Sequence, residues 1–313
     1  MMLHTPVLFL VFNRPDTTAK VFAAIRDAKP RQLFIAADGP RPEKPGEKER
    51  SEQVRKIATS VDWDCEVHRL FRDDNLGCGI AVSGAINWFF EHVEEGIILE
   101  DDCLPNKSFF RFCEELLPFH RNNNKVMMIS GNNLLNKTKG TTSYDFVKTC
   151  NIWGWATWKR AWVKYDFNLK NFERNQLFDQ ISDLTIYPEE YTNQILNEFD
   201  KVKQGKLDTW DYQWQFSVIY NQGLAIWPHV NMIKNLGFGE GATHTQWQYS
   251  FEAFLKTYEM YFPLKHPANI ELSYNTENQI TVHNLTKADK LPLHLKFKNY
   301  ISGFLKRVIG FKH

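Results

Sequence analysis

The chain has 313 residues, and its 38 Lys and Arg nearly balance its 37 Asp and Glu, which leaves a formal net charge of +1. This balance excludes a general polyanion binder and gives no support for nucleic acid as a partner. With 43% hydrophobic and 24% charged residues, the chain is excluded from the wholly disordered, collagen-like and coiled-coil classes. Its length indicates one large domain, or one domain with a substantial extension.

Two further features of the composition bear on function and location. The aromatic content is 14%, with 10 Trp, and exposed aromatic faces are common in carbohydrate sites as well as in large cores. The cysteines are scattered without a CxxC pair, which favours neither a disulfide framework nor a zinc site and fits a reducing cytoplasm. The apolar run at residues 6–12 has no basic flank and reads as a strand, and no stretch approaches the roughly 20 apolar residues of a membrane span.

In the first 130 residues, short apolar runs alternate with polar helical stretches. This pattern predicts an α/β fold with a mostly parallel central sheet flanked by helices. The predicted strands are Val7–Phe12, Leu33–Ala37, Cys65–Phe71, Gly96–Leu99 and Val126–Ser130. The predicted helices between them are Asp16–Asp27, Glu47–Thr59, Ile80–Val93 and Ser108–His120.

From about Asn132 the periodicity weakens, and the second half is expected to continue the same domain. In chain order, the sequence predicts a Trp-rich segment at Trp153–Trp158, helices near Pro188–Gln204 and Tyr212–Asn221, a short strand at Ala225–Trp227 and a glycine-bearing flap at Asn235–His244. A short basic amphipathic helix is expected at Leu295–His313.

The strongest local feature is the run Glu100-Asp101-Asp102, which directly follows a predicted buried strand. Ligands of open α/β sheets bind at the carboxyl ends of the strands. Adjacent carboxylates repel each other unless a cation accompanies them, and a divalent cation carrying a diphosphate is a natural partner. The alternative is a solvated turn that caps the following helix.

Other polar residues are expected at the same edge of the sheet. Asn13 and Arg14 follow the first strand, and Asp38 follows the second. Arg14 suits a phosphate or a nucleotide edge, and Asp38 can accept from a base N–H or a ribose hydroxyl. Ordinary loop hydrogen bonds and surface ion pairs are the alternatives for each residue taken singly.

Asp211 is the candidate general base of the second half, at the start of a predicted helix. The alternative is that Asp208 or Thr209 caps this helix and that Asp211 is a favourable charge in its first turn. The sequence has no GxxxxGK[ST], GxGxxG, HExxH or GxSxG motif, so ATPases, dinucleotide oxidoreductases and serine hydrolases lose support.

Together these residues resemble a nucleotide-diphosphosugar transferase of the GT-A fold, most closely the N-acetylglucosaminyltransferase I type, over roughly residues 5–250. The resemblance is carried, in order, by Pro6-Val7-Leu8, Asn13-Arg14, Asp38, Ile98-Leu99-Glu100-Asp101-Asp102, Trp210-Asp211 and Gly237-Phe238-Gly239 followed by His244. It implies a domain over 1–263, with a nucleotide-binding half at 1–130 and an acceptor-side half at 131–263, followed by an extension at 264–313.

The resemblance also implies roles for individual residues. Asp102 would ligate Mn²⁺ or Mg²⁺, Glu100 and Asp101 would contact the ribose and the sugar, and Asn13, Arg14 and Asp38 would hold the nucleotide. Asp211 would deprotonate the acceptor in an inverting reaction. Gly239 and His244 would belong to the flap. Asn132 and Asn133 are expected on the acceptor side, and so are Trp153 and Trp155, for which a Trp-rich core is the alternative. The Golgi enzymes carry an acid before the Arg and a membrane anchor, which indicates a different acceptor here.

The predicted function is therefore an inverting, metal-dependent glycosyltransferase that moves a sugar to a bacterial surface glycan or lipid-linked oligosaccharide, with a UDP-sugar as the expected donor. Its expected location is cytoplasmic, with the C-terminal basic helix either contacting the anionic inner face of the plasma membrane or packing on the domain. The alternatives are a nucleotidyltransferase acting on sugar phosphates and a glycan-binding protein without catalytic activity.

Overall fold

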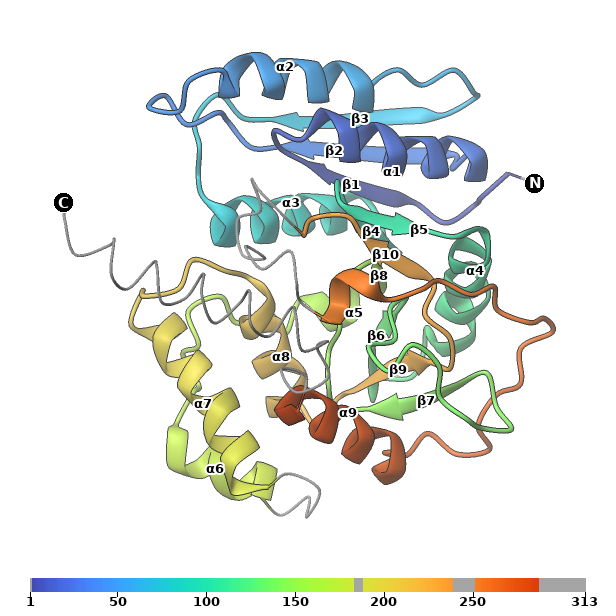
Figure 1. Cartoon of the computed structure of the whole chain (residues 1–313), viewed down its shortest axis with the longest axis vertical. Coiled ribbons are helices and arrows are strands. Elements are labelled where there is room, and N and C mark those ends of the chain that lie inside the picture. The colour runs from blue at the N-terminus through green and yellow to red at the C-terminus, as the bar shows by residue number, and fades with distance from the viewer. Residues whose placement is uncertain (1, 183–187, 239–250, 287–313) are drawn as a thin grey trace, which may run out of the picture.

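The computed structural model describes residues 2–182, 188–238 and 251–286 (Figure 1). Its centre is an eight-stranded sheet with the strand order β3-β2-β1-β4-β8-β6-β9-β7. These strands are β1 (Val7–Val11), β2 (Gln32–Ala37), β3 (Glu66–Phe71), β4 (Glu95–Glu100), β6 (Val126–Ser130), β7 (Tyr144–Val147), β8 (Trp155–Trp158) and β9 (Leu224–Pro228). A separate two-stranded sheet pairs β5 (Cys103–Pro105) antiparallel with β10 (Ile233–Asn235).

Helices cover both faces of the sheet. They are α1 (Pro15–Ala28), α2 (Glu47–Ala58), α3 (Cys78–His92), α4 (Lys107–His120), α5 (Lys159–Trp162), α6 (Arg174–Ser182), α7 (Glu189–Lys203), α8 (Asp211–Tyr220) and α9 (Tyr274–Thr286), with a 3₁₀ turn at Phe251–Phe254. One apolar cluster joins the sheet to α1, α2 and α4, and a second joins its other face to α3 and α8. The α/β class predicted from the sequence is confirmed.

The sheet is mixed, and its parallel part lies in the first half of the chain. Strands β3, β2, β1 and β4 are parallel neighbours. Strand β8 is antiparallel to both β4 and β6, and β7 is antiparallel to β9. The predicted parallel arrangement therefore describes the β3-β2-β1-β4 part, whereas the sheet beyond β4 is mixed in direction.

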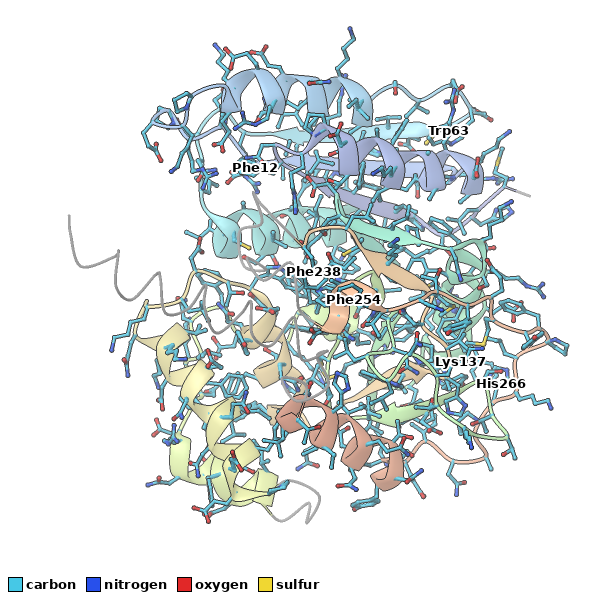
Figure 2. All side chains as sticks on the ribbon, in the orientation of Figure 1. Phe12, Trp63, Lys137, Phe238, Phe254 and His266 are labelled. Atoms are coloured by element: carbon cyan, nitrogen blue, oxygen red, sulfur yellow. The ribbon has the colours of Figure 1, made fainter. Side chains whose placement is uncertain are left out.

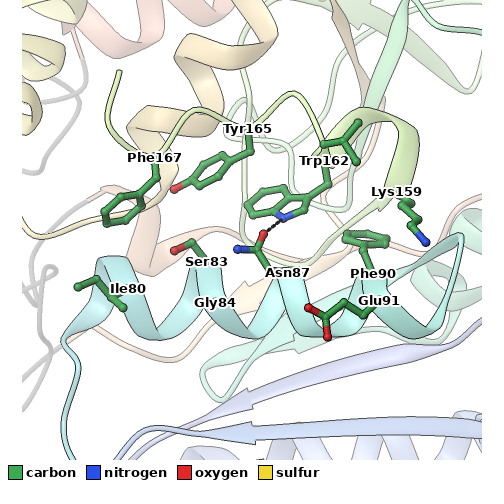
Figure 3. A pocket seen from close by; sticks show the side chains of 11 residues that line it. Ile80, Ser83, Gly84, Asn87, Phe90, Glu91, Lys159, Trp162, Tyr165 and Phe167 are labelled. Atoms are coloured by element: carbon green, nitrogen blue, oxygen red, sulfur yellow. Dashed lines mark hydrogen bonds between the residues drawn. The ribbon is translucent and has the colours of Figure 1, made fainter. Parts of the chain in front are cut away.

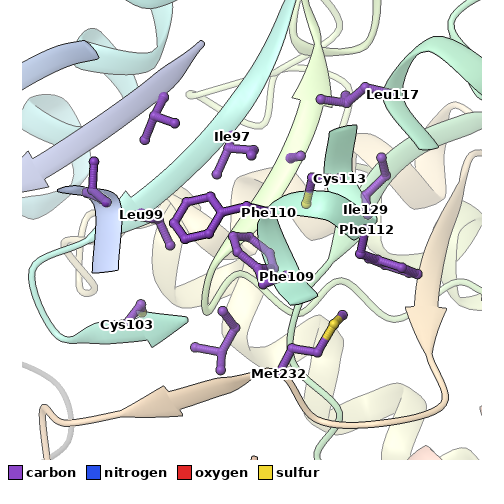
Figure 4. Packing of buried hydrophobic residues seen from close by; sticks show 14 of the residues in the cluster. Ile97, Leu99, Cys103, Phe109, Phe110, Phe112, Cys113, Leu117, Ile129 and Met232 are labelled. Atoms are coloured by element: carbon purple, nitrogen blue, oxygen red, sulfur yellow. The ribbon is translucent and has the colours of Figure 1, made fainter. Parts of the chain in front are cut away.

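The buried strands read as unbroken apolar runs because helices cover them on both sides. All five residues of β1 are buried, and alternate residues of β4 face the two clusters: Ile97 and Leu99 pack against Phe109 of α4, while Ile98 joins the α3 side (Figure 4). Strand β8 lies between β4 and β6, so the Trp-rich segment is a central strand. Its rings pack in the interior.

Several elements of the second half were not predicted, namely β7, α6, α9 and the β5–β10 pair. Helix α9 lies within the stretch expected to be an extension, but it packs on β7 and buries Ile280 completely. Helices α6 and α7 form a smaller apolar cluster with α8. Because β8 and β9 enter the sheet beside β4 and β6, the two halves of the chain share one sheet.

No helix in the part of the chain that the structure describes is long and apolar enough to cross a membrane. The basic amphipathic helix predicted at Leu295–His313 lies outside the described residues, and so do Gly239 and His244 of the predicted flap.

Candidate functional site

The carboxyl ends of β1, β2 and β4 meet at one edge of the sheet, because these strands are parallel neighbours. A cavity of about 340 Å³ opens there. We call it the strand-end cavity; its polar wall includes Arg14, Asp38, Glu100, Asp101 and Asp208. The expected convergence of Arg14, Asp38 and the acidic run is therefore observed.

Arg14 forms the ionic centre of this site. Its Nη2 lies 2.7 Å from Oδ1 of Asp101, and its Nη1 lies 2.8 Å from Oδ2 of Asp102. The other oxygen of Asp101 accepts the backbone N–H of Phe12 at 3.1 Å. Arg14 immediately precedes α1, which begins with Pro15, a residue whose fixed φ suits the first position of a helix. The turn between β1 and α1 thus directs Arg14 at the acidic run.

Burial and mutual repulsion perturb the ionisation of the acidic run. Burial raises the pKa of Asp101 to about 6, against the opposing charge of Arg14. Burial, followed by the charge of Asp102, raises the pKa of Glu100 to about 8, and Asp211 is a further contributor. Burial lowers the pKa of Arg14, but the charges of the three carboxylates outweigh this effect and raise it above its ordinary value. The negative charge of the acidic run is thus only partly neutralised by the single guanidinium of Arg14.

Asp38 lies at the end of β2 in the wall of the strand-end cavity. Its carboxylate accepts the backbone N–H of Leu76 at 3.0 and 3.1 Å and the side-chain amide of Asn75 at 3.0 Å. Burial raises its pKa in spite of these bonds. The loop after β3 therefore fixes the orientation of Asp38, and Asn75 is a site residue that sequence reasoning missed. The polar run Asp73-Asp74-Asn75 after a third parallel strand was the available signal.

Asn13 links two of the loops that border the cavity. Its Nδ2 donates to Oε1 of Glu47 at 2.7 Å. Glu47 also accepts the backbone N–H of Arg41 at 2.7 Å and its Nη2 at 2.6 Å, and only 1% of its surface is exposed. These bonds connect the loops after β1 and β2. Asn13, predicted to hold the nucleotide, therefore has a structural partner for its amide, and Arg41 enters the cavity wall instead.

Glu47→Gln is expected to lower the free energy of unfolding by about 2 kcal/mol at pH 7, because hydrogen bonds to a charged group are lost. Hydrogen bonds from Arg41 lower the pKa of Glu47 to about 2. The stabilisation is therefore complete above the ordinary pKa of about 4.5 and is lost as the pH falls toward 2. Urea unfolding at pH 7 and pH 3 measures this, with the exposed Glu49→Gln as control. Equal losses at both pH values would contradict it.

Asp208 ties the second half of the chain to the cavity. Its Oδ2 accepts the N–H of Cys78 at 2.9 Å and its Oδ1 that of Gly79 at 2.8 Å, which satisfies the first turn of α3. A Cβ on Gly77, whose φ is +80°, would lie 2.6 Å from Oδ2 of Asp208. The prediction that Asp208 or Thr209 caps the next helix is wrong, since α8 has no side-chain cap and Asp208 bonds the first turn of α3 instead. The other part of that alternative is confirmed, because Asp211 is an acidic residue in the first turn of α8.

Asp211 is the first residue of α8. Its Oδ1 accepts the hydroxyl of Thr209 and the backbone N–H of Tyr212, the latter at 2.9 Å. Its charge contributes to the raised pKa values of Glu100 and Cys78, for both of which burial is the largest cause. Asp208, three residues earlier, lines the strand-end cavity, so α8 begins near the acidic run although Asp211 follows that run by more than one hundred residues.

The segment after β10 passes directly over Asp102. The N–H of Leu236 donates to the backbone oxygen of Asp102 at 2.7 Å, and a Cβ on Gly237 would lie 2.1 Å from its Oδ2. The next residue, Phe238, meets the ring of Trp153 edge-on at a centroid distance of 5.6 Å; Figure 2 marks Phe238 beside this part of the molecule. The close approach of Gly237 to the Asp102 carboxylate thus requires glycine at this position, and Trp153 borders the site.

Three residues expected on the acceptor side belong to the interior. Trp155 is 1% exposed and stacks on Trp210 at a centroid distance of 5.6 Å. Asn132 and Asn133 are fully buried and bond to Asn231, at 3.0 Å from the Asn132 amide and 3.2 Å from the Asn133 N–H. The expectation that these residues contact an acceptor is corrected: their side chains pair and pack beneath the surface, as buried polar groups must.

The fit of a metal ion can be judged from the oxygen donors. Within residues 2–182, 188–238 and 251–286, no three His, Cys, Asp or Glu side chains are arranged to hold one. A hard cation such as Mg²⁺ is often bound by one or two carboxylates, with substrate phosphates and water as its other ligands. In the same described part, the buried Oε1 of Glu100 lacks a hydrogen-bond partner. The acidic run therefore suits a cation delivered with a phosphate ligand.

Comparison with known proteins gives only distant likenesses. No family model and no curated protein matches the sequence. The crystal structure of HddC from Yersinia pseudotuberculosis is 8% identical over 50% of this chain and 77% of that protein, with a TM-score of 0.30. The apo form of mouse xyloside xylosyltransferase 1 is 11% identical over 70% of this chain and 81% of that protein, with a TM-score of 0.35. Neither likeness identifies the family or the activity of this chain.

Proposed function

We propose that the protein is an inverting, metal-dependent glycosyltransferase of the GT-A type that uses a nucleotide-diphosphosugar. The observation that carries the proposal is the strand-end cavity, where Arg14, Asp38, Glu100 and Asp101 meet at one edge of the sheet. Asp102 is paired with Arg14, and Asp208 in the cavity wall is three residues before Asp211. A diphosphate donor requires a cationic side chain and carboxylates near its phosphates, and a hydroxyl acceptor requires a nearby base. Within this class, we propose that the protein resembles the N-acetylglucosaminyltransferase I type.

The donor would be held by residues at the ends of three strands. Asp38, buried and oriented by Asn75 and Leu76, accepts a hydrogen bond from the base or the ribose. Arg14 keeps 27% of its side chain exposed beside the carboxylates and can face a phosphate. Asp102 is the residue that would hold Mn²⁺ or Mg²⁺, which when bound neutralises charge on the diphosphate leaving group.

Asp211 would receive the proton of the acceptor hydroxyl. The hydroxyl oxygen then forms a bond to the anomeric carbon as the bond to the diphosphate oxygen breaks, with inversion at that carbon. Thr209 and the N–H of Tyr212 both bond Oδ1 of Asp211, which orients the carboxylate. A covalent enzyme intermediate is not needed in this chemistry. The acceptor we propose is a bacterial surface glycan or a lipid-linked oligosaccharide.

A thermal-shift panel tests the donor site. UDP, GDP, CDP and their common sugar conjugates are each added with and without Mn²⁺ to wild type, Asp102→Ala and the control Asp64→Ala. Asp64 is exposed and precedes β3, at the opposite edge of the parallel strands. A ligand that binds only the folded state must raise the unfolding temperature. We expect a shift with one nucleotide, strongest for UDP, that needs both Mn²⁺ and Asp102 and is retained in Asp64→Ala.

Two other results would redirect the proposal. Stabilisation by a nucleoside triphosphate, together with release of pyrophosphate from that triphosphate when a sugar phosphate is added, would identify a nucleotidyltransferase. The absence of a shift with every nucleotide would contradict the donor site altogether.

A further inference from the structure

A second, larger hollow lies along α3 on the side away from the strand-end cavity. It has a volume of about 710 Å³, and its walls include Ser83, Asn87 and Glu91 of α3 and the rings of Trp162, Tyr165 and Phe167 (Figure 3). We call it the α3 groove. Its size falls within the usual range of ligand sites. None of its residues is used by the proposed donor site.

The groove and the strand-end cavity are lined by opposite faces of the same helix. Ala81 and Ala85 face the cavity, whereas Ser83, Asn87 and Glu91 recur every four residues on the groove side. At 1.5 Å per residue, the stripe from Ile80 to Glu91 spans roughly 16 Å. A site of this length exceeds a single sugar ring.

Aromatic rings form the opposite wall of the groove. Trp162 and Tyr165 stack at a centroid distance of 4.2 Å and an interplanar angle of 12°, and Phe167 follows with its centroid 6.5 Å from that of Tyr165. The indole N–H of Trp162 donates to Oδ1 of Asn87 at 2.7 Å, which fixes both side chains across the groove (Figure 3). Trp162 is only 3% exposed, so the rings that this wall presents to the groove are those of Tyr165 and Phe167, which are half-buried.

This combination suits carbohydrate. One face of a sugar ring presents C–H groups that pack on an aromatic face, and its rim presents hydroxyls that bond to amides and carboxylates. The groove offers the half-buried rings of Tyr165 and Phe167 on one wall, and it offers the amide N–H groups of Asn87 and the exposed carboxylate of Glu91 on the other. A purely apolar ligand would cover this amide and this carboxylate without bonding to either.

One end of the groove adjoins the candidate base. The hydroxyl of Tyr165 donates to the backbone oxygen of Trp210 at 3.0 Å, and Asp211 is the next residue. Burial raises the pKa of Tyr165, and the charge of Asp211 raises it further, which is consistent with a short distance between Tyr165 and Asp211. A hydrogen bond therefore joins Tyr165 in the groove wall to the residue that precedes Asp211.

We propose that the α3 groove binds the saccharide chain of the acceptor, with its terminal sugar at Asp211 and its further sugars stacked along Tyr165 and Phe167. This inference rests on the proposed transferase function, and it names the substrate class of that site as an oligosaccharide longer than one unit. A longer chain contacts more of the groove, so binding should strengthen with chain length.

Binding to a printed array of defined oligosaccharides tests the groove, and each saccharide that binds is then titrated by calorimetry. Wild type, Phe167→Ala and Glu91→Ala are compared with the control Tyr261→Ala, which removes an aromatic ring that is 89% exposed outside the groove. We expect binding by wild type and the control, and an affinity about tenfold lower in Phe167→Ala, equivalent to about 1.4 kcal/mol. Near-ultraviolet circular dichroism checks that each variant is folded.

The outcomes separate this proposal from the transferase function. Saccharide binding that Phe167→Ala and Glu91→Ala leave unchanged would place the saccharide elsewhere and overturn the inference, and so would the absence of binding by wild type. Binding that is lost in these variants supports the groove. If it is lost in them while no nucleotide stabilises the protein, the groove stands as a glycan site and the transferase proposal fails.

Discussion

Asp211→Asn is expected to lower the rate of sugar transfer by about 10²–10⁴-fold, the usual contribution of a general base. The amide cannot take the proton of an acceptor hydroxyl, but it has nearly the shape of the carboxylate and can still accept from Thr209 and the N–H of Tyr212. Donor binding should therefore change little. Transfer is measured as nucleotide release that depends on acceptor, and donor binding by thermal shift.

Asp179→Asn is the matched control, since Asp179 is an exposed carboxylate on α6. It should transfer sugar as wild type does. Equal turnover in Asp211→Asn would remove Asp211 as the base, and loss of donor binding in the same variant would assign it to the donor site.

Arg14→Met is expected to destabilise the fold by about 3 kcal/mol at pH 7 and to abolish stabilisation by nucleotide. Removing one partner of a buried ion pair leaves an uncompensated charge, and Asp101 is 2% exposed. The matched control is Arg26→Met, which breaks an exposed pair with Asp62 and should cost less than about 1 kcal/mol. Chemical unfolding of the two variants gives the comparison.

The effect of Arg14→Met should also depend on pH in a defined direction. Without the guanidinium, the pKa of Asp101 should rise above the value of about 6 that it has beside Arg14. Asp101 titrates alike in the two unfolded proteins, so the deficit follows the difference between its two folded pKa values. The deficit is smallest below about pH 6, where the carboxyl is protonated in both folded proteins, and it grows as the pH rises from about 6 toward the higher pKa of the variant. A deficit that is constant from pH 4 to pH 8 would show that Arg14 stabilises the fold through packing alone.

The first half of the fold could be predicted because its signals are local. Each buried strand is an apolar run, each helix is amphipathic, and parallel strands place their carboxyl ends at one edge. These local signals are enough to bring Arg14, Asp38 and the acidic run together. They leave out Asn75 and Arg41, whose roles depend on how the loops after β3 and β2 fold back on the cavity.

The second half was harder to predict because its residues are defined by long-range packing. A Trp-rich segment can be a binding surface or a central strand, and only the insertion of β8 between β4 and β6 decides that Trp155 is interior. In the same way, Asn132 and Asn133 look like ligand-binding amides until Asn231, about one hundred residues later, is seen to bond to both. The α3 groove was missed because Trp162 and Tyr165 meet α3 only in the folded chain.

The position of β8 also has a consequence for the order in which the protein forms during synthesis. Strand β4, which leads into the acidic run, gains one neighbour from β1 early, but its other edge is completed only by β8. Until residue 158 has left the ribosome, the backbone groups of Glu95–Ile98 that pair with β8 are exposed on an apolar edge that invites association. The nascent chain therefore passes through a stage at which the strand that carries its future binding site is also an unpaired, aggregation-prone edge.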